Sequence, residues 1–201
     1  YNRPPLSKAL WKDAGEHSIW RPLAESGAQA FLGRRAVAVD AAAHTVTDDR
    51  GDSYRYGKLL LATGGSARRL EAQGDRILAF RTLDDYHRLL ELAERSAHIA
   101  VVGGGFVGSE LAAALVGHGC SVTLVFPEAT LGARTFPAGL SGHIDRYYRE
   151  HGVELRAGRR VTGGEQVGNR VHLKLDDGST LEADAAVAGL GIVPDTALAE
   201  A

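Results

Sequence analysis

Several kinds of residue are scarce in this 201-residue sequence, and each scarcity excludes a class of protein. The single cysteine, Cys120, excludes an internal disulfide and a Cys-x-x-Cys redox pair, and its setting at a turn favours inert packing. Neither sign of charge dominates, because 23 Lys and Arg residues face 25 Asp and Glu residues. The net charge of −2 therefore favours neither nucleic acid nor an acidic membrane surface as a partner. The longest apolar runs, such as residues 99–102, are far too short to span a bilayer.

Methionine is absent altogether, and the chain begins at Tyr1 with the loop-like Asn-Arg-Pro-Pro stretch. It stops soon after another loop, around Pro194 and Asp195, so we expect it to be an internal part of a longer protein. The eight histidines show no metal-ligand spacing, and no Ser-His-Asp or Cys-His arrangement stands out. A content of 44% hydrophobic and 24% charged residues is typical of a globular protein, and the scarcity of cysteine favours a reducing, cytoplasmic setting.

The second half of the chain predicts an α/β fold of the Rossmann type. Apolar residues recur at helical spacing in the segments 84–94, 106–118 and 139–151. Strands are predicted at 98–102, 121–126, 153–155 and 184–189. Strand and helix alternate over residues 83–126, which indicates a parallel sheet. Residues 164–175 and 180–181 are predicted to insert an antiparallel hairpin around the turn at 176–178.

The first part of the chain has a different texture. Residues 1–30 contain three prolines and are predicted to be irregular, with one or two helical turns over 6–10. A short strand is predicted at 36–39, a hairpin at 45–47 and 53–56, and a buried strand at 58–62 that ends at Thr63-Gly64-Gly65. Because the pattern changes near residue 84, we divide the chain into residues 1–82 and 83–201.

The sharpest motif is Gly103-Gly104-Gly105-Phe106-Val107-Gly108, a G-x-G-x-x-G between a predicted strand and a predicted helix. In dinucleotide-binding folds the first glycine permits a tight turn, the second lets the backbone approach a pyrophosphate, and the third lets the helix pack closely on the strand. The N–H groups of the helix start then bind the phosphates. The alternative is a glycine turn with a purely structural purpose, but the surrounding strand, helix and strand favour a dinucleotide.

Two glutamates near this motif are candidates for cofactor contacts. Glu128 lies 20 residues after Gly108, where an acidic residue holds the ribose hydroxyls, although it is equally a residue type common in solvated loops. Arg134 nearby either binds an adenosine phosphate or lies in solvent. Glu110, in the first turn of the predicted helix, either interacts with the helix dipole or points toward the nicotinamide end of the cofactor.

Two further segments have open interpretations. The N-terminal Arg3-Pro-Pro-Leu-Ser-Lys8 combines two cations with a backbone fixed by prolines, which suits a phosphate or an electron-rich ring but also a solvated basic loop. Thr63 and Gly64 end the predicted strand 58–62, where glycine allows another group to come close. An ordinary strand-ending turn is the alternative at that place.

Together these segments resemble a known family, the two-dinucleotide-binding flavoprotein reductases of the pyridine nucleotide-disulfide oxidoreductase family. The resemblance is to the branch of ferredoxin reductases and apoptosis-inducing factor. It rests on four segments in the right order: Arg3-Pro-Pro-Leu-Ser-Lys8, Leu61-Ala-Thr-Gly-Gly65, Gly103-Gly-Gly-Phe-Val-Gly-Ser-Glu110 and Gly189-Leu-Gly-Ile-Val-Pro-Asp195. The family's first G-x-G-x-x-G, which binds FAD, and its later Gly-Asp motif do not occur in this sequence.

The resemblance implies FAD and NAD(H) as cofactors, with residues 1–82 as part of an FAD-binding domain and 83–201 as the NAD(H)-binding domain. It implies that Arg3 and Lys8 touch FAD, that Phe106 lies at the nicotinamide, and that Glu110 pairs with Lys8 beside the flavin. It also assigns FAD contacts to Thr63, Gly64 and Gly191, pyrophosphate contacts to the motif Gly103–Gly108 including Val107, and the adenine ribose to Glu128.

The activity implied is the transfer of hydride from NADH to FAD and of electrons to an acceptor, which is a ferredoxin, a quinone, oxygen or another small molecule. Two other functions stay open. One is a redox sensor with little turnover, in which NADH changes the shape or dimer state of the protein, as in apoptosis-inducing factor. The other is a bare NAD-binding module. A homodimer is compatible with each of these.

Overall fold

The computed structural model of this chain describes residues 1–12 and 14–200. The chain forms two compact units, which we call the larger unit (Tyr1–Trp20 with Ala67–Gly191) and the smaller unit (Arg21–Ser66 with the chain from Ile192 onward). The division expected by cofactor, between residues 82 and 83, is a different one and stays a prediction.

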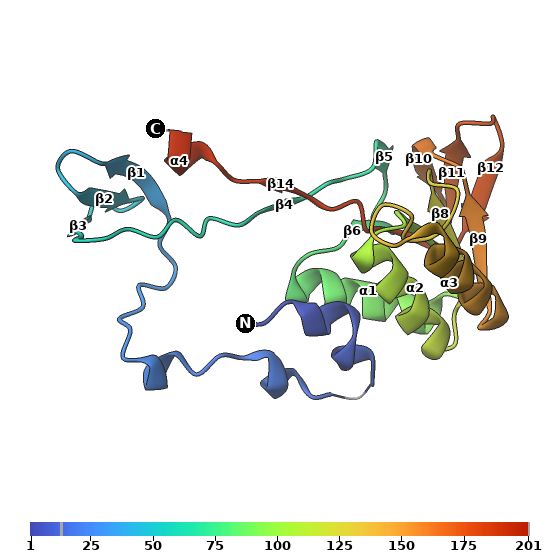
Figure 1. The fold of residues 1–201 in the computed structure, drawn as a ribbon, viewed down its shortest axis with the longest axis horizontal. Helices are drawn as coiled ribbons and strands as arrows, with labels where there is room; N and C mark the ends of the chain where they lie inside the picture. The colour runs from blue at the N-terminus through green and yellow to red at the C-terminus, as the bar shows by residue number, and fades with distance from the viewer. Residues whose placement is uncertain (13, 201) are drawn as a thin grey trace. The chain divides into compact units, whose positions relative to one another are not determined.

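The larger unit is built on a five-stranded parallel sheet with the order β6-β13-β7-β8-β9 (Figure 1). Its strands are β6 (Ile77–Ala79), β7 (His98–Val102), β8 (Ser121–Phe126), β9 (Val153–Ala157) and β13 (Ala185–Ala188). The helices α1 (Leu83–Arg95), α2 (Phe106–Gly117) and α3 (Ala138–Glu150) are its crossover connections. Because the sheet is covered on both faces, β7, β8 and β13 are almost fully buried along their length.

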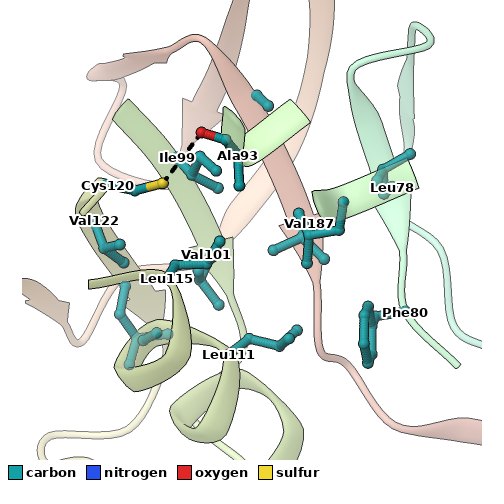
Figure 2. Packing of buried hydrophobic residues seen from close by; sticks show 14 of the residues in the cluster. Leu78, Phe80, Ala93, Ile99, Val101, Leu111, Leu115, Cys120, Val122 and Val187 are labelled. Atoms are coloured by element: carbon teal, nitrogen blue, oxygen red, sulfur yellow. Dashed lines mark hydrogen bonds between the residues drawn. The ribbon is translucent and has the colours of Figure 1, made fainter. Parts of the chain in front are cut away.

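Alternate residues of the sheet enter two different cores. Ile99, Val101 and Leu124 pack with helix residues such as Leu89 and Leu111, and we call this cluster the helix-side core. Figure 2 shows this cluster, in which Cys120 is buried and its Sγ donates to the carbonyl oxygen of Ala93 over 3.6 Å. Burial raises the pKa of the Cys120 thiol, which agrees with the packing role expected for it.

On the opposite face of the parallel sheet, Ala100 and Val102 pack against a four-stranded sheet with the order β12-β11-β10-β5. Its strands are β5 (Ala72–Gln73), β10 (Val161–Val167), β11 (Arg170–Leu175) and β12 (Thr180–Ala183). Here the prediction was wrong in one respect: residues 164–175 are not one strand. Gly168 has φ +59°, so the chain reverses there and two hairpins form in place of one.

The first twenty residues also belong to the larger unit. They form short 3₁₀ turns, η1 (Pro4–Ser7), η2 (Ala9–Lys12) and η3 (Glu16–Ile19), in agreement with the irregular structure predicted for them. Leu6, Leu10 and Ile19 are buried in the helix-side core. The phenol of Tyr86 on α1 donates to the carbonyl oxygen of Leu10 over 3.1 Å. The N-terminal segment is thereby held against the helices of the parallel sheet.

The smaller unit contains η4 (Leu23–Ser26), the three-stranded antiparallel sheet β1 (Ala36–Asp40), β2 (Thr45–Asp48) and β3 (Ser53–Arg55), and the short helix α4 (Ala197–Glu200). A separate two-stranded sheet pairs β4 (Gly65–Ala67) with β14 (Ile192–Pro194). Burial alone would raise the pKa of the Asp48 carboxyl, but hydrogen bonds from Arg34, Tyr54 and two backbone N–H groups hold that pKa well below its usual range.

The buried strand predicted at residues 58–62 was wrong. No strand forms there in the described part of the chain, and Leu60 is 88% exposed. The prediction rested on the apolar run Leu59-Leu60-Leu61, but such a run becomes a strand only where a neighbouring strand accepts its backbone hydrogen bonds. Among the described residues, no helix combines the length and the apolar character needed to cross a membrane.

Candidate functional site

The glycine motif forms a tight turn between β7 and α2, and two of its glycines are required by the packing of backbone on backbone. Gly103 has φ +112°, and its N–H donates to the carbonyl oxygen of Val125 over 2.8 Å. A Cβ on Gly103 would lie 2.7 Å from the carbonyl oxygen of Gly189, and a Cβ on Gly108 would lie 1.8 Å from that of Gly103. Only hydrogen fits at these two positions, so α2 can approach the sheet closely.

Gly105 differs from its neighbours because it borders open space. It is the N-cap residue of α2 with an extended backbone (φ −84°, ψ −173°), and no described heavy atom lies within 4 Å of a Cβ built there. No described side chain caps α2, and its first turn carries no acidic residue. Helix-start N–H groups without a cap, at an open surface that carries no Cβ, have the geometry that suits an anionic group such as a pyrophosphate, and this role stays a prediction.

Next to this turn the structure brings together Lys8 and Glu110, which are 102 residues apart in sequence. Lys8 Nζ lies 2.8 Å from Glu110 Oε1. The hydroxyl of Ser7 donates to the other carboxylate oxygen, Oε2, over 2.6 Å. The ion pair expected from the resemblance therefore exists in the larger unit, and the Glu110 carboxylate serves a partner outside its own helix.

Phe106 and Val107 begin α2 and face different surroundings. Phe106 is 63% exposed, so its ring is accessible to a planar ligand. Val107 is partly buried against the helix-side core, where it positions the helix. The phenol of Tyr148 on α3 donates to the carbonyl oxygen of Ser109 over 3.2 Å, and burial raises the pKa of that phenol. Tyr148 therefore fixes the start of α2 as a neutral hydrogen-bond donor.

Glu128 lies just after β8, in the loop expected to face the adenine ribose. Its carbonyl oxygen accepts a hydrogen bond of 2.8 Å from the N–H of Gly158, which anchors the loop to the end of β9. Arg134 Nη1 lies 3.9 Å from Glu128 Oε1, and the Arg134 side chain is 84% exposed. At this distance the pair is loose, so the carboxylate remains available to a ligand.

The remaining predicted contacts lie in other segments of the chain. Thr63 and Gly64 lie in the smaller unit, where both contact Asp195. The Thr63 hydroxyl donates to the carbonyl oxygen of Asp195, and the N–H of Asp195 donates to the carbonyl oxygen of Gly64 over 3.0 Å. Gly191 has φ +83° and accepts from the N–H of Arg68. The carbonyl of Arg3 accepts from the N–H of Leu6. Their roles toward FAD stay predictions.

Two residues at the site were missed by sequence reasoning, Ser7 and Tyr148. Ser7 belongs to the N-terminal motif but no contact with Glu110 was predicted for it, and Tyr148 lies in the predicted helix 139–151 without an individual role. Each contacts a residue far away in the chain, Glu110 and Ser109, so no local spacing could have identified them. No group of three or more His, Cys, Asp or Glu side chains in residues 1–12 and 14–200 is arranged to hold a metal ion.

Comparisons with known proteins agree with this geometry. A family model described as pyridine nucleotide-disulphide oxidoreductase matches residues 1–201. The chain is 35% identical to the 5,5'-dehydrodivanillate O-demethylase ferredoxin reductase subunit of Sphingobium sp., over 98% of this chain and 50% of that protein. It is also 35% identical to the ferredoxin--NAD(+) reductase component of the p-cumate 2,3-dioxygenase system of Pseudomonas putida, over 97% of this chain and 50% of that protein.

A solved structure with a similar fold is the ferredoxin reductase for the CYP199A2 system from Rhodopseudomonas palustris. It superimposes with a TM-score of 0.89 at 31% sequence identity, over 100% of this chain and 52% of that one. The chain thus spans about half the length of the curated relatives that it matches.

Proposed function

The chain belongs to the pyridine nucleotide-disulphide oxidoreductase family, and we propose that it supplies the NADH-binding part of a flavin-dependent reductase that delivers electrons to a ferredoxin. The glycine turn carries this proposal. Gly103 and Gly108 are required by backbone contacts, whereas Gly105 borders open space at an uncapped helix start. A turn with a purely structural purpose does not need a bare surface at Gly105, but a pyrophosphate does.

The residues present fit NADH along the edge of the larger unit. Gly105 and the first N–H groups of α2 would hold the pyrophosphate. Glu128 would accept hydrogen bonds from the ribose hydroxyls, and Phe106 would lie against the nicotinamide. For FAD, which accepts hydride from NADH when it is bound, the proposed contacts are Arg3, Lys8, Thr63, Gly64 and Gly191.

Lys8 and Glu110 have complementary tasks in this proposal. The ammonium of Lys8 favours negative charge on a nearby electron acceptor, because opposite charges attract. The side chain of Lys8 is 51% exposed, so it is accessible to a ligand while it is paired. Glu110 holds the ammonium in place and partly offsets its charge.

Ferredoxin is the proposed acceptor because relatives of known function are named as ferredoxin reductases. The test uses the full-length, flavin-loaded protein with NADH and, separately, a ferredoxin and a quinone. Rapid turnover with ferredoxin is the expected result. Rapid turnover only with a quinone would identify a quinone as the acceptor in place of ferredoxin. Slow turnover with every acceptor would favour a redox sensor.

The ion pair is tested separately by anaerobic reduction of the bound flavin with NADH. Lys8→Ala is expected to slow reduction and Glu110→Ala to change the affinity for NADH. Residues in contact couple by roughly 0.5–3 kcal/mol, so the double variant should depart from the sum of the single effects. Strictly additive effects would show that Lys8 and Glu110 do not act together.

A further inference from the structure

Ser7 contacts the same carboxylate as Lys8, its neighbour in sequence. Its hydroxyl donates to Glu110 Oε2 over 2.6 Å, while Lys8 Nζ lies 2.8 Å from Oε1. Each oxygen of Glu110 therefore has its own donor. Ser7 is 5% exposed, whereas half of the Lys8 side chain is in contact with solvent. Of the two donors in this triad of Ser7, Lys8 and Glu110, Ser7 is therefore the one held in a fixed position.

The Ser7 hydroxyl has two acceptors within reach but only one hydrogen to donate. The carbonyl oxygen of Pro4 is 3.5 Å away, at the limit of a hydrogen bond, and Glu110 is 2.6 Å away. A short bond to a carboxylate is stronger than a long one to a neutral carbonyl. The hydrogen therefore lies on the side of Glu110, and Ser7 contributes little to closing its own turn.

We propose that Ser7 is a positioning residue, which fixes the Glu110 carboxylate so that Oε1 faces the ammonium of Lys8. An exposed ion pair is weak on its own, because two long side chains must be ordered to form it. With Glu110 already held from a buried position, only Lys8 has to be ordered. The inference deepens the proposed function and rests on it, since it concerns the placement of the Lys8 ammonium beside the flavin.

The first test needs no flavin and uses the 201-residue chain. Limited acetylation followed by mass spectrometry measures how readily the Lys8 amine reacts, with the exposed Lys174 as an internal reference. Ser7→Ala and the nearly isosteric Ser7→Cys, whose thiol is a poor donor, are expected to raise the reactivity of Lys8 relative to Lys174 roughly fivefold. Ser141→Ala removes another buried hydroxyl from the larger unit, far along the sequence from the triad, and should leave this ratio unchanged.

The second test is the rate of flavin reduction by NADH in the full-length protein. Ser7→Cys is expected to slow this rate about tenfold. Ser7→Thr, which keeps the hydroxyl, is expected to retain most of the rate of the unaltered protein. In a Glu110→Ala background, Ser7→Cys should have no further effect, because its action passes through the carboxylate.

The outcomes separate the two proposals. If Ser7→Cys changes neither Lys8 reactivity nor reduction, or if its effect is equally large in the Glu110→Ala background, the positioning role is refuted while the role of the ion pair stands. If Glu110→Ala alters neither the rate of reduction by NADH nor the affinity for NADH, the proposed function of the pair fails, and the role of Ser7 fails with it.

Discussion

Replacing Gly108 by alanine attacks the closest backbone approach in the glycine turn. The new Cβ would lie 1.8 Å from the carbonyl oxygen of Gly103, whereas real Cβ atoms essentially never come closer than 3.0 Å to such an atom. Both partners are backbone, so no side chain can rotate away. Helix α2 must instead move away from β7 by more than about 1 Å, and such overpacking typically lowers the free energy of unfolding by 1–3 kcal/mol. We expect a loss of about 3 kcal/mol, at the upper end of that range.

The same displacement should weaken the binding of NADH. The helix-start N–H groups move with α2, and the close approach of Gly108 to Gly189, where a Cβ on Gly189 would lie 2.7 Å from the nitrogen of Gly108, opens as well. A loss of about 1.4 kcal/mol in binding free energy raises the dissociation constant tenfold, and we expect the dissociation constant for NADH to rise at least tenfold. Urea unfolding followed by circular dichroism gives the free energy, and titration by NADH fluorescence gives the dissociation constant.

Two other glycines supply matched controls. Gly105→Ala meets no described atom within 4 Å and needs no unusual backbone, so it should cost no more than about 1 kcal/mol, the usual preference for glycine over alanine at an N-cap, while weakening NADH binding about tenfold. Gly142→Ala, inside α3 and equally free of contacts, should stabilise the chain by up to about 1 kcal/mol without affecting NADH. If Gly108→Ala is as stable as the unaltered chain, the packing argument is wrong; if Gly105→Ala binds NADH normally, the pyrophosphate lies elsewhere.

Three other expectations concern ligand choice and acid stability. The chain should bind NADH more tightly than NADPH, because the Glu128 carboxylate repels a 2′-phosphate; equal or tighter binding of NADPH in a fluorescence titration refutes this. The 201-residue chain alone should bind FAD weakly or not at all, since the glycine motif implied for FAD is absent from it, and a flavin spectrum near one FAD per chain after purification is the contrary result. Asp48→Asn should lower Tm at about pH 7 but less at about pH 3, because a carboxyl with a depressed pKa stabilises the fold above its ordinary pKa of about 3.9 and loses this effect as the pH falls toward the folded-state value. An equal loss of Tm at both pH values would contradict it.

Residues 98–126 show why part of this fold could be predicted from the sequence. The strands at 98–102 and 121–126 have the predicted bounds, and α2 ends one residue before the predicted 118. In a parallel sheet covered on both faces, a strand is a continuous apolar run, and the crossover helix follows it within a few residues. The information that specifies these elements is therefore local, and the glycines between them mark the turn.

Residues 58–62 show the opposite case. Their run of three leucines and an alanine is about as apolar as the correctly predicted strand 98–102 but lacks its β-branched residues, and Leu60 is exposed and no strand forms there among the described residues. β7 lies between β8 and β13, and its backbone N–H and C=O groups form hydrogen bonds with these two strands. Part of the difference therefore lies in the neighbours, and a neighbour distant in sequence leaves no trace in the local pattern.

The candidate site combines both kinds of information. The turn at Gly103–Gly108 could be predicted because its roles follow from spacing, and the pair of Lys8 with Glu110 could be expected only through the resemblance, since helix-dipole stabilisation explains Glu110 equally well from the sequence. In the structure both oxygens of the carboxylate are engaged by the N-terminal segment, so Glu110 has partners outside its own helix, and its role toward the cofactor stays a prediction. Burial of Leu6 in the core of the larger unit fixes that segment, and it thereby sets the place where the adjacent Ser7 and Lys8 meet α2. A residue on the apolar side of a 3₁₀ turn thus controls the geometry of a charged pair that no local pattern could reveal.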